Sequence, residues 1–474
     1  MYNALILPIS ENKSKFVKLG GMFMSQSVDY NWKANDEKHV WHSMKPYNPD
    51  ATFIVEQAEG AWLTDIDGNK YLDAMAGLWC TNIGYGRKEI AEVAYEQILK
   101  NSYTPLSYGH TPSILLSQKI SELLGDEYVV FYSNSGSEAN EVAFKIVRQY
   151  YQQKGETNRY KIISRYRSYH GNTMGSLAAT GQAQRKYKYE PLAPGFLHVA
   201  PPDQYRNPEE MESGDPTTLP SVKTIDQTIT WEMPETVAAV IMEPIITGGG
   251  VIVPNDAYLK GVQEVCEKHG TLLIVDEVIC GFGRTGKAFG FQNYGIKPDI
   301  VTMAKGLTSA YMPLSATAVR REIYEQFTSN GDYEFLRHVN TFGGSPVACA
   351  VALKNIEIME RENLFEQSAL LGEQLMDDLK EGLSDHPFVG NIRGKGLLIG
   401  IELVENKETK SPLDITKVNA VIAYCKEKGL IIGKNGVTVA NFNNVLTLSP
   451  PLSITLEEKN FIVDTFIEAV SSIK

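Results

Sequence analysis

Cysteine is scarce in this chain, which has five cysteines among 474 residues. No two of them form a Cys-x-x-Cys pair, so a disulfide framework and a zinc site are both disfavoured. The eight histidines are scattered, and only His39 and His42 are close in sequence. This scatter disfavours a metal hydrolase and predicts no metal site. Thiols that do not pair fit a reducing compartment, so we expect a cytoplasmic protein.

Two further absences, of excess positive charge and of long apolar runs, narrow the possible partners. The chain has 45 Lys and Arg against 57 Asp and Glu, a formal net charge of −12. A nucleic-acid-binding protein needs a basic face, so that class is disfavoured, although a local cluster of donors can still hold a small anion. The most apolar segments, 237–246 and 271–278, contain Glu243 and Asp276 and fall short of the roughly 20 residues that span a membrane.

Short apolar runs alternate with helical patterns from about residue 75 to residue 345, which is typical of βαβ units and a mostly parallel sheet. Residues 346–474 differ, with a long helical pattern followed by short strands and a final helix. We therefore predict an α/β fold with a large domain over 75–345 and a small α+β domain built from 24–74 and 346–474. Residues 1–23 look unlike the rest, and we expect an upstream extension there. The Pro-rich stretch 195–231 is expected to be a surface excursion.

Two ionisable residues directly follow predicted parallel strands. Asp276 follows Leu-Leu-Ile-Val and Lys305 follows Ile-Val-Thr-Met-Ala, at the strand ends where open α/β sheets bind ligands. The pair suits pyridoxal phosphate, because a lysine forms a Schiff base with its aldehyde and an aspartate keeps its ring nitrogen protonated. On residue types alone, a surface lysine and an unrelated strand-end carboxylate explain the two residues equally well.

Two other segments are candidates for the same site. The loop 133–138 lies between a predicted strand and a predicted helix, where backbone N–H groups and the helix dipole favour an anion. Simple capping of the helix by one of its serines is the alternative. Tyr169 and His170 follow another predicted strand, where the tyrosine could stack on a planar ring or pack as an ordinary loop residue. The candidate phosphate ligands are Ser135, Gly136 and Ser137.

Six motifs follow one another along the chain. They are Ser-Gly-Ser-Glu-Ala-Asn at 135–140, Tyr-His-Gly at 169–171, Glu-Pro at 243–244, Asp-Glu-Val-Ile-Cys-Gly-Phe-Gly-Arg-Thr-Gly at 276–286, Ala-Lys-Gly at 304–306 and Thr-Phe-Gly-Gly-Ser-Pro at 341–346. Together they resemble the class III aminotransferases, which have pyridoxal-phosphate fold type I. The resemblance extends from about residue 44 to the C-terminus, and the motif at 276–286 is highly specific.

The resemblance implies a role for each motif. Lys305 would form the Schiff base and shuttle a proton, and Asp276 would bind the pyridine nitrogen. Val278 would pack beneath the ring, opposite Tyr169. Thr341 would bind the phosphate from the neighbouring subunit, which implies a homodimer with shared active sites. The other cofactor-binding residues that it implies are Ser135, Gly136, Ser137, His170 and Glu243.

The segment Gly-Leu-Trp-Cys-Thr-Asn-Ile-Gly-Tyr-Gly-Arg at 77–87 resembles the ω-aminotransferase branch, in which Trp79 would line the substrate pocket. That branch moves amino groups from ω-amino acids or amines, usually to pyruvate. Relatives commonly place a carboxylate-binding arginine near Gly433 or before the Pro-Pro-Leu segment, and this chain has none at either place. A guanidinium can bind a carboxylate bidentately, whereas the lysine at position 434 cannot. Lys434 and Arg87 remain as fallback anchors for the carboxylate.

We therefore expect a pyridoxal-phosphate-dependent transaminase that takes an amino group from an ω-amino acid or amine and gives it to pyruvate in a ping-pong cycle. The missing arginines predict a preference for donors without an α-carboxylate. The donor stays open among taurine, β-alanine, diamines and arylalkylamines. The alternatives are an aminomutase, an adenosylmethionine-8-amino-7-oxononanoate-type transaminase, and a cofactor-binding protein without turnover.

Overall fold

The computed structural model has two compact units, one made of residues 1–57 and 64–69 and the other of residues 58–63 and 70–474. The described residues of the first unit include a two-stranded antiparallel hairpin, β1 (Phe16–Leu19) and β2 (Met22–Ser25), and a helix, α1 (Trp32–His39). Most of the expected extension over residues 1–23 lies outside the described residues. The structure describes residues 16–19, 22–25, 31–44, 48, 53–211, 214–329, 331–435, 439 and 442–473.

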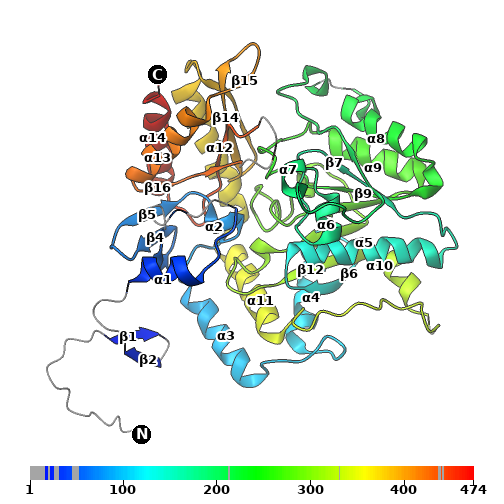
Figure 1. Ribbon diagram of the computed structural model, residues 1–474. Helices are drawn as coiled ribbons and strands as arrows, with labels where there is room; N and C mark the ends of the chain where they lie inside the picture. Colours follow the sequence, from blue (N-terminus) through cyan, green and yellow to red (C-terminus); the bar gives the residue numbers. More distant parts are fainter. Residues whose placement is uncertain are drawn as a thin grey trace, which may run out of the picture. The chain divides into compact units, whose positions relative to one another are not determined.

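A seven-stranded sheet lies in the second unit, with the strand order β6-β12-β11-β10-β9-β7-β8 (Figure 1). Strands β8 to β7, β7 to β9, β9 to β10 and β10 to β11 pair in parallel, whereas β12 pairs antiparallel with both β11 and β6. The predicted mostly parallel α/β sheet is confirmed. The strands are β6 (Tyr128–Ser133), β7 (Lys161–Arg165), β8 (Phe196–Val199), β9 (Val237–Met242), β10 (Leu272–Asp276), β11 (Ile300–Met303) and β12 (Ser315–Arg320).

The central strands are apolar without interruption because helices cover both of their faces. Ile241 and Ile274 pack in one cluster with residues of α5 (Gly136–Gln153). Their neighbours Val240 and Leu273 point the other way and pack in a second cluster with residues of α8 (Pro220–Trp231) and α9 (Tyr258–His269). Alternate residues of each strand therefore serve the two cores, and the ends of the strands are left free to form a site.

The prediction of a surface excursion over 195–231 is wrong, because this stretch contributes two packed elements. Strand β8 pairs with β7 at the edge of the large sheet, and Val222, Ile225 and Ile229 of α8 are buried. Proline is tolerated in the first turn of a helix, where its missing N–H would have no partner. Pro220 therefore begins α8 and does not signal an irregular loop.

After the large sheet, the long helical pattern divides into α11 (Pro346–Arg361) and α12 (Leu364–Leu383), with Asn363 in a left-handed conformation between them. A second sheet follows, with the order β13-β14-β18-β17 and with β15 paired to β14. Strand β5 (Lys70–Asp73) pairs in parallel with β16 (Leu430–Ile431), which joins distant parts of the sequence. The other elements here are β13 (Val389–Gly394), β14 (Ile399–Asn406), β15 (Ser411–Pro412), β17 (Gly433–Lys434), β18 (Val445–Leu448), α13 (Ile415–Glu427) and α14 (Leu456–Ser471).

The second unit contains further helices between its strands. Among the described ranges, no helix is both long and apolar enough to cross a membrane. The connecting helices are α2 (Ala76–Trp79), α3 (Lys88–Lys100), α4 (Thr111–Leu124), α6 (Met174–Ala179), α7 (Ala183–Lys186) and α10 (Arg321–Tyr324).

Arg284, in the specific motif at 276–286, connects three segments of the second unit. Its side chain is fully buried and donates to the Leu397 carbonyl at 3.0 Å and to the Asn82 side-chain oxygen at 2.9 Å. A third bond goes to the Pro450 carbonyl. Burial lowers the pKa of Arg284 to about 10. The motif is therefore partly structural, since one guanidinium satisfies acceptors from distant parts of the chain.

Replacing Arg284 by methionine should lower the free energy of unfolding by about 3–5 kcal/mol, because three buried oxygens lose their donor. Urea unfolding monitored by circular dichroism measures the change in the free energy of unfolding. Arg361→Met is the control, since Arg361 is exposed and bonds to Glu89 at the surface. Its stability should stay near that of the wild type. Equal losses in the two variants would contradict this role for Arg284.

Candidate active site

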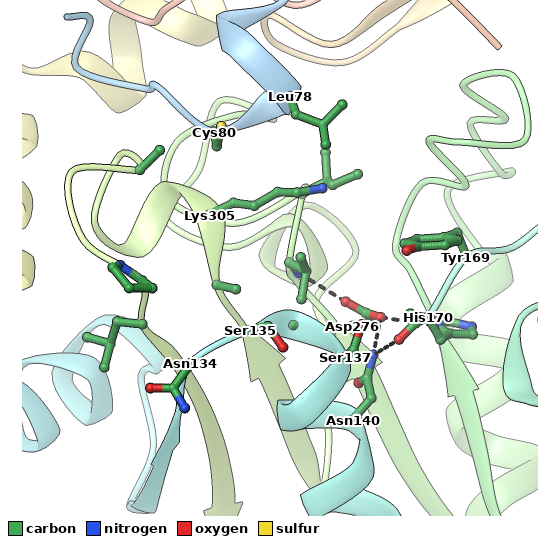
Figure 2. Close-up of a pocket in the computed structure, with 18 of the residues that line it drawn as sticks. Leu78, Cys80, Asn134, Ser135, Ser137, Asn140, Tyr169, His170, Asp276 and Lys305 are labelled. Atoms are coloured by element: carbon green, nitrogen blue, oxygen red, sulfur yellow. Dashed lines mark hydrogen bonds and ion pairs between the residues drawn. The ribbon is translucent and has the colours of Figure 1, made fainter. Parts of the chain in front are cut away.

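A cavity of about 480 Å³ lies at the carboxyl ends of β10 and β11 (Figure 2). Parallel strands place their ligands at this edge of a sheet. The structure brings most of the predicted site residues into the cavity wall, but Trp79, Thr341 and Lys434 are not among the residues that line it. The predicted residues in the wall are Ser135, Gly136, Ser137, Tyr169, His170, Glu243, Asp276, Val278 and Lys305.

Asp276, the last residue of β10, is buried and held in one orientation. Asn140 Nδ2 donates to its Oδ2 at 2.9 Å, and the backbone N–H of Val278 donates to its Oδ1 at 3.1 Å. Nδ1 of His170 lies 2.9 Å from the same Oδ2, and because a carboxylate accepts, this nitrogen carries a proton. Thr302 in turn donates to Asn140 at 2.7 Å. Three protein groups thus fix the orientation of the carboxylate.

His170 and Asn140 both support Asp276. The His170 ring lies against Asp276 Oδ2 and also lines the cavity. Asn140 belongs to the motif at 135–140, but the sequence pattern assigned it no role of its own. Asn140 lies four residues after Gly136 on α5, and residues four apart lie on the same face of a helix. This spacing could have indicated that Asn140 faces the same site as Gly136.

Lys305 extends into the cavity from the turn after β11 (Figure 2). Its φ of 46° is in the left-handed region, which costs a non-glycine residue about 1–3 kcal/mol and is typical of functional sites. Burial lowers the pKa of the Lys305 amine, and the opposing influence of Cys80 and Asp276 is smaller. The amine is therefore neutral more often than that of a solvated lysine, and a neutral amine is the nucleophilic form.

The N-terminus of α5 forms the wall beside Asp276. Ser135 caps the helix, accepting from the Glu138 backbone N–H at 3.3 Å, so the capping role considered for the serines is real for Ser135. A Cβ added to Gly136 would lie 2.9 Å from Val278 Cγ2, so only glycine allows the two to approach this closely. The first N–H groups of the helix have no intrahelical acceptor and, with the helix dipole, suit a phosphate.

Glu243 and Tyr169 lie together on another side of the cavity. Glu243 follows β9 and accepts from the backbone N–H groups of Tyr169 at 3.1 Å and Thr247 at 3.2 Å. Burial raises the pKa of Glu243. The carboxylate therefore anchors the backbone of the loop that presents the Tyr169 ring, which lines the cavity.

Arg185, which no sequence motif marks, lies on α7 beside the cavity-lining Tyr169. Its guanidinium carbon is 4.6 Å from the centre of the Tyr169 ring, and its Nε donates to Gln182 at 2.7 Å. Burial lowers the pKa of Arg185, although an arginine stays charged at neutral pH. Arg185 belongs to a short basic stretch of the sequence. Such a stretch is typical of an exposed surface, so its pattern did not indicate a site residue.

The fallback carboxylate anchors are engaged elsewhere. Lys434 Nζ donates to Asn419 at 2.9 Å, and Arg87 forms a two-pronged pair with Glu362 at 2.9 and 2.8 Å. A Cβ added to Gly433 would lie 2.2 Å from the Thr447 hydroxyl and 2.3 Å from a methionine sulfur. A side chain at position 433 would therefore require the Thr447 and Met75 side chains to move.

Trp79 and Thr341 are the other predicted residues outside the wall. Lys305 Nζ lies 5.5 Å from the centre of the Trp79 ring, so this indole is a neighbour of the lysine. The residues on either side of it, Leu78 and Cys80, line the cavity instead. Thr341 is exposed in this chain.

The chain is similar to known proteins over most of its length. The aminotransferase class-III family model matches residues 44–470. The chain is 62% identical to an uncharacterized aminotransferase, YhxA, of Bacillus subtilis (strain 168), over 93% of this chain and 97% of the relative. It is 42% identical to a taurine–pyruvate aminotransferase of Bilophila wadsworthia, over 93% and 97%. A crystal structure of a Bacillus anthracis aminotransferase is 61% identical, with a TM-score of 0.92 over 93% of this chain and 98% of that chain.

Class III aminotransferases depend on pyridoxal 5′-phosphate, and the residues of the cavity fit that group. The helix N-terminus with the close approach of Gly136 to Val278 suits its phosphate, the fixed carboxylate of Asp276 suits its ring nitrogen, and Lys305 suits its aldehyde. The chain belongs to the class III aminotransferases, pyridoxal-phosphate-dependent enzymes of fold type I.

Proposed function

We propose that this enzyme takes an amino group from an ω-amino acid or amine that carries a remote acid group, and gives it to pyruvate in a ping-pong cycle. The observation that carries the proposal is the position of Arg185, whose guanidinium stacks on the cavity-lining Tyr169. The resemblance to a taurine–pyruvate aminotransferase supports the same substrate class.

Pyridoxal phosphate supplies a reactive aldehyde and a ring that withdraws electrons. The Nζ of Lys305, with its lowered pKa, would be the nucleophile toward that aldehyde and would move a proton to and from the reacting carbon of the substrate. The carboxylate of Asp276, held by Asn140 and the Val278 N–H, would hold the ring nitrogen and keep it protonated. Gly136 and Ser137, at the first N–H groups of α5, would hold the phosphate.

Arg185 is the residue that binds the acid group of the substrate. A guanidinium offers two parallel donors to a carboxylate or sulfonate, and its partly buried position strengthens such a bond. The acid group of an ω-amino acid is remote from its amine and reaches such a position. An α-carboxylate sits on the reacting carbon itself, so α-amino acids should be the poorer donors.

We further propose a cytoplasmic homodimer in which Thr341 of the partner subunit completes each phosphate site. In its own chain Thr341 is exposed and lies outside the cavity wall, as a residue that serves a second copy must. Its neighbour Phe342 is 66% exposed, which supports burial by a second copy.

Arg185→Gln should lower the rate constant of the donor half-reaction with taurine or β-alanine by about 10- to 100-fold, which corresponds to the loss of one charge-assisted hydrogen bond. The half-reaction with propylamine, which has no acid group, should change little. Single-turnover mixing with the donor alone, monitored by the cofactor absorbance, measures this half-reaction. Because pyruvate is absent, a change in pyruvate binding does not affect the result. Lys434→Met is the matched control and should leave both donors unaffected. If Lys434→Met slowed the half-reaction with taurine or β-alanine and Arg185→Gln did not, Lys434 and not Arg185 would bind the acid group.

Lys305→Ala should abolish the covalent link to the cofactor and lower turnover by at least about 10³-fold, because both nucleophile and proton carrier are lost. Borohydride reduction followed by peptide mass spectrometry locates the link, and circular dichroism checks the fold. Lys287→Ala, an exposed lysine of a neighbouring loop, should keep a pyridoxyl group on Lys305. A reduced link on another lysine in the Lys305→Ala protein would show that the assignment is mistaken.

Asp276→Asn should retain the cofactor but slow turnover by about 10²-fold or more, because a neutral amide cannot keep the ring nitrogen protonated. The asparagine preserves the shape of the side chain, so Asn140 and His170 keep a partner at that position. Steady-state kinetics and the cofactor content of the purified protein measure the two effects. Turnover within a few-fold of the wild type would exclude this role.

A further inference from the structure

A strained turn forms one side of the cavity. It contains α2 and connects β5 to the segment before α3, and three of its residues have left-handed φ angles, Ala76 at 46°, Gly77 at 66° and Trp79 at 57°. Such angles cost non-glycine residues about 1–3 kcal/mol each, so the turn persists only if its surroundings hold it.

Asp73, the last residue of β5, holds this turn. Its buried carboxylate accepts from the backbone N–H groups of Met75 at 2.9 Å and Gly77 at 2.6 Å, and from the Tyr85 hydroxyl at 2.7 Å. A Cβ added to Gly77 would lie 3.2 Å from that hydroxyl. Burial, with the nearby Asp73, raises the pKa of Tyr85, so its hydroxyl stays a donor. One carboxylate and one phenol thus fix the backbone of the turn.

The turn places three side chains around Lys305. Leu78 and Cys80 line the cavity, and in Figure 2 they lie on the side of the Lys305 side chain away from Asp276. Trp79 is the residue between Leu78 and Cys80 in the sequence, and the centre of its ring lies 5.5 Å from Lys305 Nζ. Any shift of the turn therefore moves the cavity wall that faces the reacting end of the lysine, while the phosphate and ring-nitrogen contacts lie on other elements.

We propose that Asp73 and Tyr85 are positioning residues that determine which donors the cavity accepts, by fixing the strained turn that presents Leu78 and Cys80. This inference rests on the proposed transaminase function, because donor size is read from its turnover. Neither Asp73 nor Tyr85 lines the cavity, and their side-chain hydrogen bonds go to the turn and to each other, so they act through the turn.

The first test is Tyr85→Phe, which removes one hydroxyl and keeps the ring. The ratio of kcat/KM for β-alanine to that for 1-phenylethylamine, with pyruvate as acceptor, should change by about 10-fold. The cofactor absorbance of the holoenzyme should not change. Gly125→Ala is the control, because Gly125 caps α4 at a φ of 78° with open space around it. It should destabilise the protein and leave the ratio unaltered. A ratio within two-fold of wild type in Tyr85→Phe would overturn the proposal.

The second test asks whether Tyr85 acts through Leu78. If it does, Leu78→Ala should shift the same ratio, and adding Tyr85→Phe to it should produce little further change. Independent, additive shifts in the double variant would mean that Tyr85 does not act through this wall.

A third readout needs no turnover. Cys80 is the one cysteine of the five that is not buried, so loosening the turn should speed its alkylation by iodoacetamide, located by peptide mass spectrometry. An unchanged rate in Tyr85→Phe would contradict the positioning role. If the wild type transaminates no donor, the proposed function fails, while this alkylation rate still decides whether the hydroxyl holds the turn.

Discussion

The buried carboxylate of Asp276 is the constraint on which the site depends. A charged group at the end of a buried strand is costly unless it is satisfied, and here an amide, an imidazole and a backbone N–H satisfy it. Its partners come from α5, from the loop after β7 and from the turn after β10. Satisfying one carboxylate therefore aligns three elements, and all three contribute residues to the wall of the cavity.

The fold and the centre of the site were predictable from the sequence because their signals are local. Uninterrupted apolar strands followed by Asp276 and Lys305 indicate a parallel sheet with its ligand edge, and the small residues of 133–138 indicate a helix N-terminus. The structure places all of them around one cavity. The two packed elements in 195–231 were not predicted, since proline and charge obscured a short edge strand and a helix that begins with Pro220.

The substrate side of the site was less predictable, because it depends on contacts between residues that are distant in sequence. Lys434 and Arg87 were reasonable anchors by charge, yet each is taken by a neighbour that no pattern reveals. Arg185 had no motif at all, and only the fold brings it to Tyr169. The strained turn at Asp73 was invisible for the same reason, since backbone angles and the reach of Tyr85 follow from tertiary structure.

The central claim is that an amine donor passes its amino group to pyruvate at this site. The most direct measurement is the stoichiometry of alanine formed against donor consumed, for taurine and β-alanine, with and without pyruvate. The account predicts one alanine for each donor consumed, and no sustained turnover when pyruvate is left out. Turnover that continues without any acceptor would contradict it and would favour an intramolecular amino transfer.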